Sequence, residues 1–513
     1  MTAKEGAYTP PREVFQAGSA TYARLFRESA SLNADRMALI EGARSRTYAE
    51  LDERSNSMAR VLLNKGLDRG DRVGVLTRNC IEFMEVELAA AKIGVISVNL
   101  NWRQTPAELA HCARLTAPSF IVSGKEFVEP LKVAGWQTDL VIGPGYEAAL
   151  DTVEPAELPD VYVEGEDGLC ILFTSGTTGM PKGALISNRA MVARALIFAT
   201  ETGAPKDDTF IAWSPLFHMG SNDFTLATLL RGGQVVIIDG YDADKMIDAI
   251  EEYAVHYVTV VPGMIEDFIT HFKARNAKPK PIGLIGAMAD LVPRRLLKEI
   301  TTLLNAPYFN TFGSTETGKP PASASLIPVG EAPENLSKKQ NDFCQVRLVD
   351  PDGNDVADGE PGELAIRGPS VFSGYWGNDA ANQDAFRGGW FHMGDVFRRN
   401  PDGTLDFVDR VKYMIKSGGE NIYPAEIEQH IMVDRRILDV AVVRKPHEKW
   451  GEVPVVFAAR SDQALTTEDV IGMCRGRIAN YKLPKEVYFI EMDDLPRSTS
   501  GKIQRHILEE RFK

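Results

Sequence analysis

A ten-residue segment rich in glycine and hydroxyl side chains is the strongest chemical signal in the sequence. It follows the apolar stretch 170–173 and consists of Thr174-Ser175-Gly176-Thr177-Thr178-Gly179-Met180-Pro181-Lys182-Gly183. Glycines let backbone N–H groups turn toward one point, hydroxyls add donors, and the lysine adds a positive charge. A loop of this composition can surround the oxygens of a polyphosphate.

Two alternatives compete with that interpretation. A Walker A loop has the pattern G-x-x-x-x-G-K-[ST]. Counted from Gly176, that pattern requires glycine where Pro181 stands and a hydroxyl where Gly183 stands, so the match fails. The other alternative is an ordinary Gly/Thr-rich connecting loop. The concentration of hydroxyls, glycines and a lysine favours phosphate binding.

The segment resembles the phosphate loop of adenylate-forming enzymes, a superfamily of acyl- and aryl-CoA synthetases, luciferases and peptide-synthetase adenylation domains. Further stretches resemble segments of that superfamily in the same order, over roughly residues 45–505. These stretches are 46–51 (RTYAEL), 70–73 (GDRV), 215–220 (PLFHMG), 311–316 (TFGSTE), 390–395 (WFHMGD), 409–410 (DR), 417–424 (SGGENIYP) and 496–503 (PRSTSGKI). The resemblance implies an AMP-forming acyl- or aryl-CoA synthetase.

Such an enzyme joins a carboxylate to the α-phosphorus of ATP, releases pyrophosphate, and then transfers the acyl group to the sulfur of CoA. By the resemblance, Mg²⁺ is held by Glu316 and Thr178, since hard cations prefer oxygen ligands. Asp395 would accept hydrogen bonds from the ribose hydroxyls. The full set expected to bind ATP or AMP is Thr174, Ser175, Gly176, Thr177, Thr178, Gly179, Lys182, Phe312, Gly313, Thr315, Asp395 and Arg410.

Two of these assignments have simpler alternatives. Glu316 could be an acidic residue at a helix start, where carboxylates are common. Asp409 and Arg410 could form a local salt-bridged turn.

The C-terminal residues are expected to supply a mobile lysine and a CoA channel. The resemblance implies that Lys502 bridges the carboxylate and the α-phosphate during adenylation, a task that suits a point charge on a flexible stem. Lys412 stands at the hinge position about which the small domain rotates between the two half-reactions. Gly418, Gly419 and Trp450 are expected near CoA.

The acyl group is expected to lie against Trp213, His218 and the small-residue stretch Gly286-Ala287-Met288. His218 is also counted, with Lys502, Lys412 and Glu316, among the catalytic residues. The alternative for His218 is a histidine packed in the core beside Trp213 and Phe217. The acid is predicted to be medium-chain, aromatic or ring-containing.

Other functions within and outside the superfamily fit the sequence less well. A stand-alone domain that adenylates an amino acid and loads a carrier protein is the main alternative. The PLFHMG segment, however, lacks the acidic residue that such domains use for the α-amine. A luciferase-type monooxygenase and a degenerate nucleotide-binding regulator are less favoured.

The elements that must position these residues alternate between strands and helices. Strands are predicted at 72–76, 95–99, 120–122, 169–174, 209–213, 235–238 and 257–261, and helices at 82–93, 188–199 and 243–253. This pattern predicts an α/β fold with a large N-terminal domain, 1–410, of mixed, mainly parallel sheets and flanking helices. Turn-rich short strands after about residue 330 indicate a β-barrel-like subdomain. A small α+β cap is expected at 411–513, and residues 1–20 are predicted to form a loosely held arm.

Composition excludes several classes. The 513 residues carry a formal net charge of −14, which argues against a nucleic-acid partner. No apolar run approaches the roughly 18 residues needed to span a bilayer. The five cysteines are dispersed, which is typical of reduced thiols in a cytoplasmic protein. The partners that the resemblance implies are ATP, CoA and a small carboxylic acid, with a homodimer as a further possibility.

Overall fold

The computed structural model describes residues 14, 18, 20–153, 158–159, 161–174, 180–418, 420–497 and 503–512. Nearly all of the predicted N-terminal arm lies outside these residues. So do five residues of the phosphate loop (Ser175, Gly176, Thr177, Thr178 and Gly179), together with Gly419 and Lys502.

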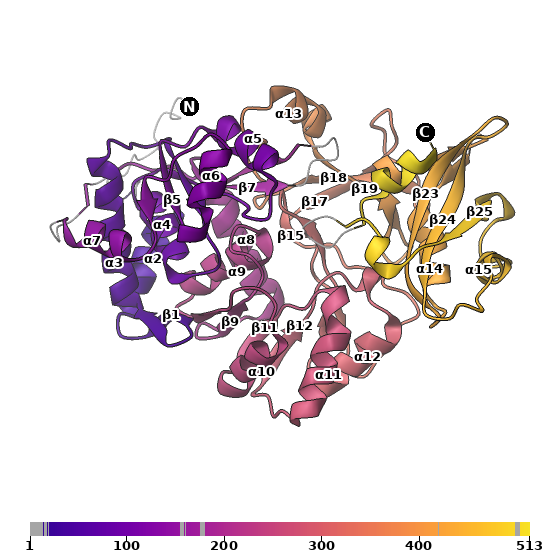
Figure 1. Ribbon diagram of the computed structural model, residues 1–513, viewed down its shortest axis with the longest axis horizontal. Coiled ribbons are helices and arrows are strands. Elements are labelled where there is room, and N and C mark those ends of the chain that lie inside the picture. The colour runs from indigo at the N-terminus through magenta and orange to yellow at the C-terminus, as the bar shows by residue number, and fades with distance from the viewer. Residues whose placement is uncertain are drawn as a thin grey trace, which may run out of the picture.

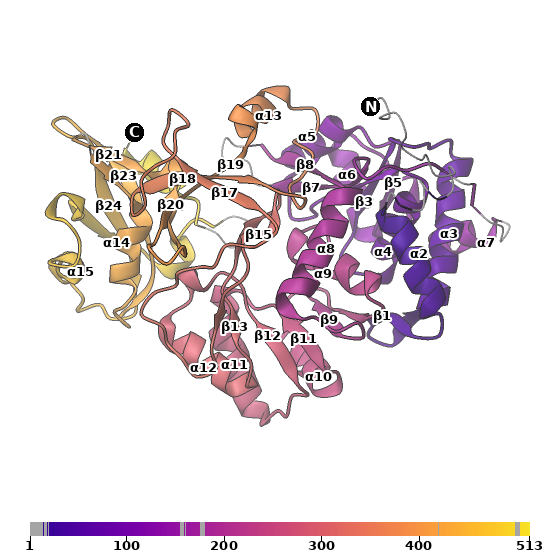
Figure 2. The same ribbon diagram turned by 180° about the vertical axis from the view of Figure 1, so that it is seen from behind.

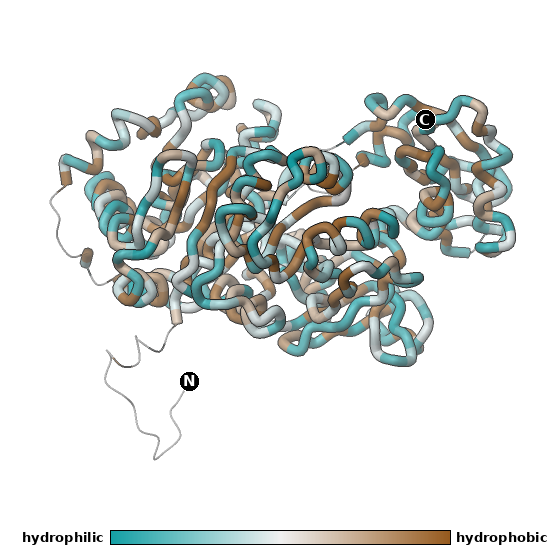
Figure 3. Tube along the Cα trace, turned by 90° about the horizontal axis from the view of Figure 1, so that it is seen from below, coloured by the Kyte–Doolittle hydropathy of each residue, from teal (hydrophilic) through white to brown (hydrophobic). Residues whose placement is uncertain are grey.

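The molecule is elongated, with the N-terminal α/β part at one end and the C-terminal strands β23–β25 at the other (Figure 1). Figure 2 shows the strands β17–β20 between these two parts, with α10, α11 and α12 along the lower edge. In Figure 3 hydrophobic stretches run along the interior strands of the N-terminal part. The predicted α/β class is confirmed.

Two largely parallel sheets form the N-terminal part. In the larger sheet the strand order is β16 (Leu326–Ile327), β13 (Tyr308–Phe309), β12 (Ile282–Ile285), β11 (Val255–Val258), β9 (Thr209–Ala212), β10 (Gln234–Ile237), β1 (Met37–Glu41) and β2 (Arg44–Thr47). In the smaller sheet it is β6 (Leu140–Val141), β5 (Phe120–Ser123), β3 (Arg72–Leu76), β4 (Ile96–Asn99), β7 (Gly168–Thr174) and β8 (Lys182–Ser187). Antiparallel pairs occur where β2, β16 and β8 join these sheets.

Helices cover and separate these sheets. They are α2 (Tyr22–Leu32), α3 (Tyr48–Asn64), α4 (Ile81–Lys92), α5 (Pro106–Thr116), α6 (Val128–Val133), α7 (Pro144–Asp151), α8 (Asn188–Thr202), α9 (Met219–Leu230), α10 (Ala243–Glu252), α11 (Ile265–Arg275) and α12 (Arg294–Leu304). Every residue of α4 is buried. Since none of its faces is exposed to solvent, α4 belongs to the interior, and its charged residues Glu82, Glu85, Glu87 and Lys92 are buried with it. Within the part of the chain that the structure describes, no helix has the length and apolar character to cross a membrane.

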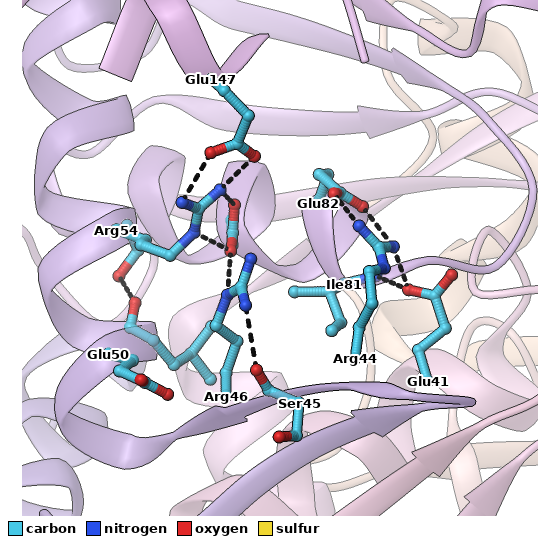
Figure 4. A network of polar contacts seen from close by, with 12 residues as sticks. Glu41, Arg44, Ser45, Arg46, Glu50, Arg54, Ile81, Glu82 and Glu147 are labelled. Atoms are coloured by element: carbon cyan, nitrogen blue, oxygen red, sulfur yellow. Dashed lines mark hydrogen bonds and ion pairs between the residues drawn. The ribbon is translucent and has the colours of Figure 1, made fainter. Parts of the chain in front are cut away.

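Ion pairs tie α3 to its neighbours. The Arg54 guanidinium donates to both carboxylate oxygens of Glu147 in α7, at 2.9 and 2.8 Å (Figure 4). Arg54 and Arg46 also pair with Glu85, whose side chain is fully buried. A buried carboxylate is stable only when it is paired and hydrogen-bonded, so this network fixes how α3, α4 and α7 pack.

The chain then forms two antiparallel sheets. The strands β14 (Phe312–Ser314) and β15 (Gly318–Ala322) pair with each other. A four-stranded sheet follows in the order β17 (Gln345–Val349), β18 (Pro361–Arg367), β19 (Phe391–Arg399) and β20 (Leu405–Arg410), with α13 (Asp379–Ala385) between β18 and β19. The predicted antiparallel region is confirmed, but its strand order is open and closure into a barrel is not confirmed.

Residues after the short helix η5 (Val411–Tyr413) build a further sheet with its own core. Its strands are β21 (Ile415–Ser417), β22 (Glu420–Ile422), β23 (Ile437–His447), β24 (Gly451–Arg460) and β25 (Glu486–Phe489). Its helices are α14 (Pro424–Ile431), α15 (Thr467–Cys474) and α16 (Arg505–Glu509). Two hydrophobic clusters within this region include Ile415, Ile427, Val442 and Phe457.

Candidate active site

The predicted phosphate loop joins two adjacent strands. Thr174 ends β7 and Lys182 begins β8, and the two residues face each other in the antiparallel register. The Lys182 ammonium lies 4.7 Å from the centre of the Tyr375 ring. A cation over an aromatic face is attracted by the ring's negative charge density, so this contact fixes the lysine at the mouth of the loop.

Tyr375 also connects the loop to Glu316. Its hydroxyl donates to Glu316 Oε1 at 2.9 Å. Burial, reinforced by the Glu316 carboxylate, raises the pKa of Tyr375, so the phenol stays protonated and remains a donor. Glu316 lies in the turn between β14 and β15 rather than at a helix start, so the helix-start alternative is wrong. Lys182 and Glu316, far apart in sequence, therefore meet through one tyrosine.

A buried arginine holds the turn that carries Glu316. Arg194 in α8 donates to the carbonyl oxygens of Thr315 and Ser370, at 3.0 and 3.1 Å. It also pairs with Asp223 of α9 at 3.1 Å. Burial raises the pKa of Asp223, whereas the Arg194 charge lowers it. Arg194 thus positions both the Thr315–Glu316 turn and the helix that follows His218.

Asp395 and Arg410 face each other on the strands β19 and β20. The Arg410 guanidinium lies 3.1 Å from Asp395 Oδ1, and Asp395 is only 3% exposed. Asp409 makes a different set of contacts, accepting from the backbone N–H groups of Arg410 and Ala425 at 2.7 Å each. The alternative of a salt-bridged Asp409–Arg410 turn is therefore wrong, because Arg410 pairs with the predicted ribose ligand.

Asp409 caps the first turn of α14. Ala425 is the second residue of that helix, so the carboxylate satisfies one of the N–H groups that a helix start leaves without a partner. Burial raises the pKa of Asp409 to about 6, with a further rise from Glu428 and an opposing effect of Arg505. Asp409, which lies before the predicted hinge residue Lys412, is thus fastened to a helix that follows Lys412.

Phe312, one of the residues predicted to bind ATP or AMP, is packed in the core. Phe312 is 3% exposed, and its ring stacks on Phe407 with centroids 5.3 Å apart and meets the edge of Phe397 at 4.8 Å. This packing joins β14 to β19 and β20. Glu316, in the turn after β14, and Asp395, in β19, are therefore carried by strands that pack against each other. Gly313 has no room for a side chain, since a Cβ there would lie 1.9 Å from the Gly318 oxygen.

His218 is exposed, so the alternative of a packed core histidine is wrong. It precedes α9, where its Nδ1 accepts from the Gly220 N–H at 3.1 Å. Trp213, by contrast, is 5% exposed and donates from its indole to the Thr259 oxygen at 2.7 Å. His218 is therefore accessible from solvent, whereas Trp213 is buried.

The stretch Gly286-Ala287-Met288 is held by two tyrosines. Tyr257 donates to the Gly286 oxygen at 2.8 Å, and Tyr308 donates to the Ala287 oxygen at 2.9 Å. Gly286 has a φ of +76°, and a Cβ there would lie 2.2 Å from the Tyr308 ring, so only glycine fits. The stretch is therefore a fixed wall and not a mobile loop.

Gly418 packs directly on Trp450. Its N–H donates to the Trp450 oxygen at 2.8 Å, and a Cβ at this glycine would lie 2.7 Å from Trp450 Cε3. The two residues predicted near CoA are thus in contact. Lys412 lies in η5 beside this region, where its carbonyl oxygen accepts from the Arg444 guanidinium.

The described residues contain no cluster of three or more histidine, cysteine, aspartate or glutamate side chains suited to a metal. A single carboxylate is sufficient for a magnesium ion that arrives with a nucleotide, because such ions are bound by one or two carboxylates and by phosphate oxygens. Glu316, fixed by Tyr375, fits that requirement. Thr178, the second predicted ligand, lies outside the described residues.

Comparisons with known proteins identify the family to which the chain belongs. Residues 26–376 match the family described as AMP-binding enzyme, and residues 426–502 match the AMP-binding enzyme C-terminal domain. An indoleacetate–CoA ligase of Aromatoleum aromaticum is 34% identical over 496 residues, covering 93% of this chain and 95% of that enzyme. A feruloyl-CoA synthase of an Amycolatopsis species is 33% identical over 485 residues, covering 93% and 96%.

Solved structures show the same likeness. The o-succinylbenzoate CoA synthetase of Bacillus subtilis, in complex with the acyl-adenylate intermediate, has a TM-score of 0.83 at 26% identity, covering 94% of this chain and 97% of that one. The same enzyme with ATP and a magnesium ion has a TM-score of 0.82 at 25% identity, covering 94% and 98%. The chain therefore belongs to the family of AMP-binding enzymes, and it is an adenylate-forming acyl- or aryl-CoA synthetase.

Proposed function

We propose that this enzyme activates an aromatic carboxylic acid with ATP and transfers the resulting acyl group to CoA. The observation that best supports an adenylation site here is the chain of contacts from Lys182 through Tyr375 to Glu316. It combines a cation and a carboxylate at the end of the glycine-rich loop, as the phosphates of MgATP require.

In the first half-reaction most of the catalysis is positioning and charge neutralisation. Lys182 binds the phosphates together with the loop residues Thr174 to Gly179. Asp395 accepts from the ribose hydroxyls, and Arg410 orients that carboxylate while remaining partly exposed for a second contact. Lys502 neutralises charge between the acid and the α-phosphate. The carboxylate oxygen forms a bond to the α-phosphorus, and pyrophosphate leaves.

Glu316 would hold Mg²⁺, with Thr178 as the second ligand. When bound, the ion supplies positive charge to the phosphate oxygens as pyrophosphate departs. The contribution of Tyr375 is to orient the Glu316 carboxylate through its hydrogen bond.

In the second half-reaction the cap, residues 411–513, rotates about Lys412 against the body, residues 1–410. The rotation withdraws Lys502 and brings Gly418, Gly419 and Trp450 to the thiol path. The CoA sulfur then attacks the acyl carbonyl, and AMP leaves. The separate hydrophobic core of the cap supports this division, because a part with its own core can move as a unit.

Two observations support an aromatic substrate, the names of the relatives and the residues that would surround the acid. The two curated relatives are named for indoleacetate and for feruloyl-CoA, both aromatic. The wall that would receive the acid consists of Trp213, Met288 and the Gly286-Ala287 stretch that Tyr257 and Tyr308 fix. His218, exposed at the start of α9, borders the reacting carboxylate.

A panel of acids tests the proposal. Pyrophosphate release is measured with indole-3-acetate, ferulate and benzoate, and with straight-chain acids of the same carbon number. We expect aromatic acids to give the higher kcat/KM. A preference for the straight-chain acids would refute the aromatic class, and failure of every acid to release pyrophosphate would refute the adenylation site.

Two further properties belong to the proposal, the cellular location and the oligomeric state. We infer a cytoplasmic enzyme with reduced thiols, which the five free cysteines support. We also infer a homodimer, for which sedimentation velocity is the direct measurement.

A further inference from the structure

The chain on either side of the segment that contains Lys502 is fastened at one place in the cap. Lys502 itself lies outside the described residues, but Ile503, which is bonded to it, does not. Ile503 pairs with Arg497 in an antiparallel bridge, and the Gln504 N–H donates to the Pro496 oxygen at 2.7 Å. Because Lys502 is one peptide bond from Ile503, whatever holds the residues after Ile503 also limits where the lysine can lie.

Arg505, two residues after Ile503, anchors the start of α16. Its Nη2 atom donates to both carboxylate oxygens of Glu428 in α14, at 2.7 Å each. The two side chains are 16% and 15% exposed. Glu428 is itself fixed, because it accepts from the Val442 N–H of β23 at 2.6 Å. Hydrogen bonds between charged groups are short and directional, so α16 begins at a defined point on α14.

The same helix contacts the hinge segment from both of its ends. At its start the Arg505 guanidinium lies 4.4 Å from the centre of the Tyr413 ring, in η5 next to Lys412. At its end Glu509 accepts from Arg444 at 3.0 Å, and Arg444 also donates to the Lys412 oxygen. The helix that follows Lys502 is thus braced against α14 and against the predicted hinge.

We propose that Arg505 is a positioning residue for Lys502 in the adenylation half-reaction. It holds the start of α16 against Glu428 and Tyr413, and thereby the chain from which the lysine extends three residues earlier. Such an anchor matters because a misplacement of about 1 Å can cost roughly 100-fold in rate. This inference rests on the proposed function, which assigns Lys502 to adenylation alone. The thioester step, from which Lys502 is withdrawn, does not need the anchor.

Substitutions of the anchor in the full-length enzyme test the proposal. Arg505→Gln removes the charge and the paired hydrogen bonds, whereas Arg505→Lys keeps the charge without the planar fork. Val470→Ala, at a buried position of α15, is the control for a destabilised cap. Each variant is assayed for pyrophosphate release without CoA and for conversion of supplied acyl-AMP with CoA. Lys502→Ala and the double variant Lys502→Ala/Arg505→Gln complete a mutant cycle, and thermal unfolding is measured alongside.

We expect Arg505→Gln to lower adenylation by about 10- to 100-fold and to leave thioester formation within about twofold of wild type. Arg505→Lys should recover part of the loss, and Val470→Ala should keep the two half-reactions in their wild-type ratio. In the Lys502→Ala background, Arg505→Gln should cost less than about twofold more, because a residue that acts through the lysine has no effect without it. If Arg505→Gln does not fold, Arg505→Met with Glu428→Gln removes both buried charges together and should show the same selective loss.

Equal slowing of both half-reactions in Arg505→Gln, or adenylation at the wild-type rate, would overturn the proposal. A selective loss of adenylation in Val470→Ala would overturn it as well. So would a full additional loss in the double variant, because Arg505 would then act independently of Lys502. In each of these cases Lys502→Ala still loses adenylation, and the proposed function stands. Full adenylation by Lys502→Ala would instead refute the role of that lysine in the proposed function, and this inference with it.

Discussion

The contact between Gly418 and Trp450 makes the CoA half-reaction separately testable through Gly418→Ala. The glycine has a φ of +61°, so an alanine there carries a left-handed strain of about 1–2 kcal/mol. Its Cβ would also lie 2.7 Å from Trp450 Cε3. Ordinary carbon contacts are about 3.5–4.0 Å, so the indole must move by roughly 1 Å.

The expected rate of thioester formation follows from the size of this displacement. A misplacement of about 1 Å in a binding group can cost roughly 100-fold in rate. We therefore expect Gly418→Ala to slow thioester formation by about 10- to 100-fold. Adenylation should stay within about twofold of wild type, because Trp450 belongs to the cap and not to the ATP site.

Two assays separate the half-reactions. Pyrophosphate release without CoA reports adenylation, and conversion of supplied acyl-AMP with CoA reports thioester formation. Gly476→Ala is the matched control, since Gly476 has a φ of +72° in the same cap and no atom within 4 Å of its Cβ position. It carries the backbone strain without the indole contact, so both half-reactions should remain near wild type. Equal loss of adenylation and thioester formation in Gly418→Ala would refute a specific role of the Gly418–Trp450 contact in the CoA half-reaction. Thioester formation at the wild-type rate would refute that role as well.

Three further predictions concern the adenylation site and the hinge. Lys502→Ala should lower adenylation by roughly 100-fold or more while still converting supplied acyl-AMP, and equal loss of both steps would contradict its assigned role. Tyr375→Phe keeps the ring beneath Lys182 but removes the donor to Glu316, so kcat/KM for pyrophosphate release should fall about tenfold; an unchanged value would show that the hydrogen bond does not orient the carboxylate. The pKa of Asp409 is about 6 in the folded protein and roughly 3.8 when unfolded, so its proton adds stability that is fully present below about pH 3.8 and is lost as pH rises through 6. Between pH 5 and 7.5 the wild type should thus lose about 1 kcal/mol that Asp409→Asn does not lose, and parallel unfolding curves for the two proteins would argue against the raised pKa.

The periodicity of apolar residues along the sequence was sufficient to predict helices and strands that position the site. The strand predicted at 72–76 is β3 with identical bounds, and the helix predicted at 243–253 is α10, Ala243–Glu252. The strand predicted at 257–261 was displaced, because β11 occupies 255–258 and the chain turns at Pro262.

Contacts between distant segments could not be predicted in this way. Tyr375 joins Lys182 to Glu316, yet nothing near residue 375 indicates those partners. Arg194 gave a weak signal, a charged residue in an otherwise apolar helix segment, but its acceptors on Thr315 and Ser370 lie more than 100 residues away. Phe312 shows the converse, because its motif predicts contact with ATP or AMP, while the structure places its ring against Phe407.

In the proposed reaction a carboxylate oxygen of the acid is joined to AMP before CoA reacts. An aromatic acid labelled with ¹⁸O in its carboxylate is turned over with ATP, Mg²⁺ and CoA, and the products are analysed by mass spectrometry. We expect one labelled oxygen in each AMP formed and none in pyrophosphate. Unlabelled AMP, or label in phosphate released with ADP, would contradict it.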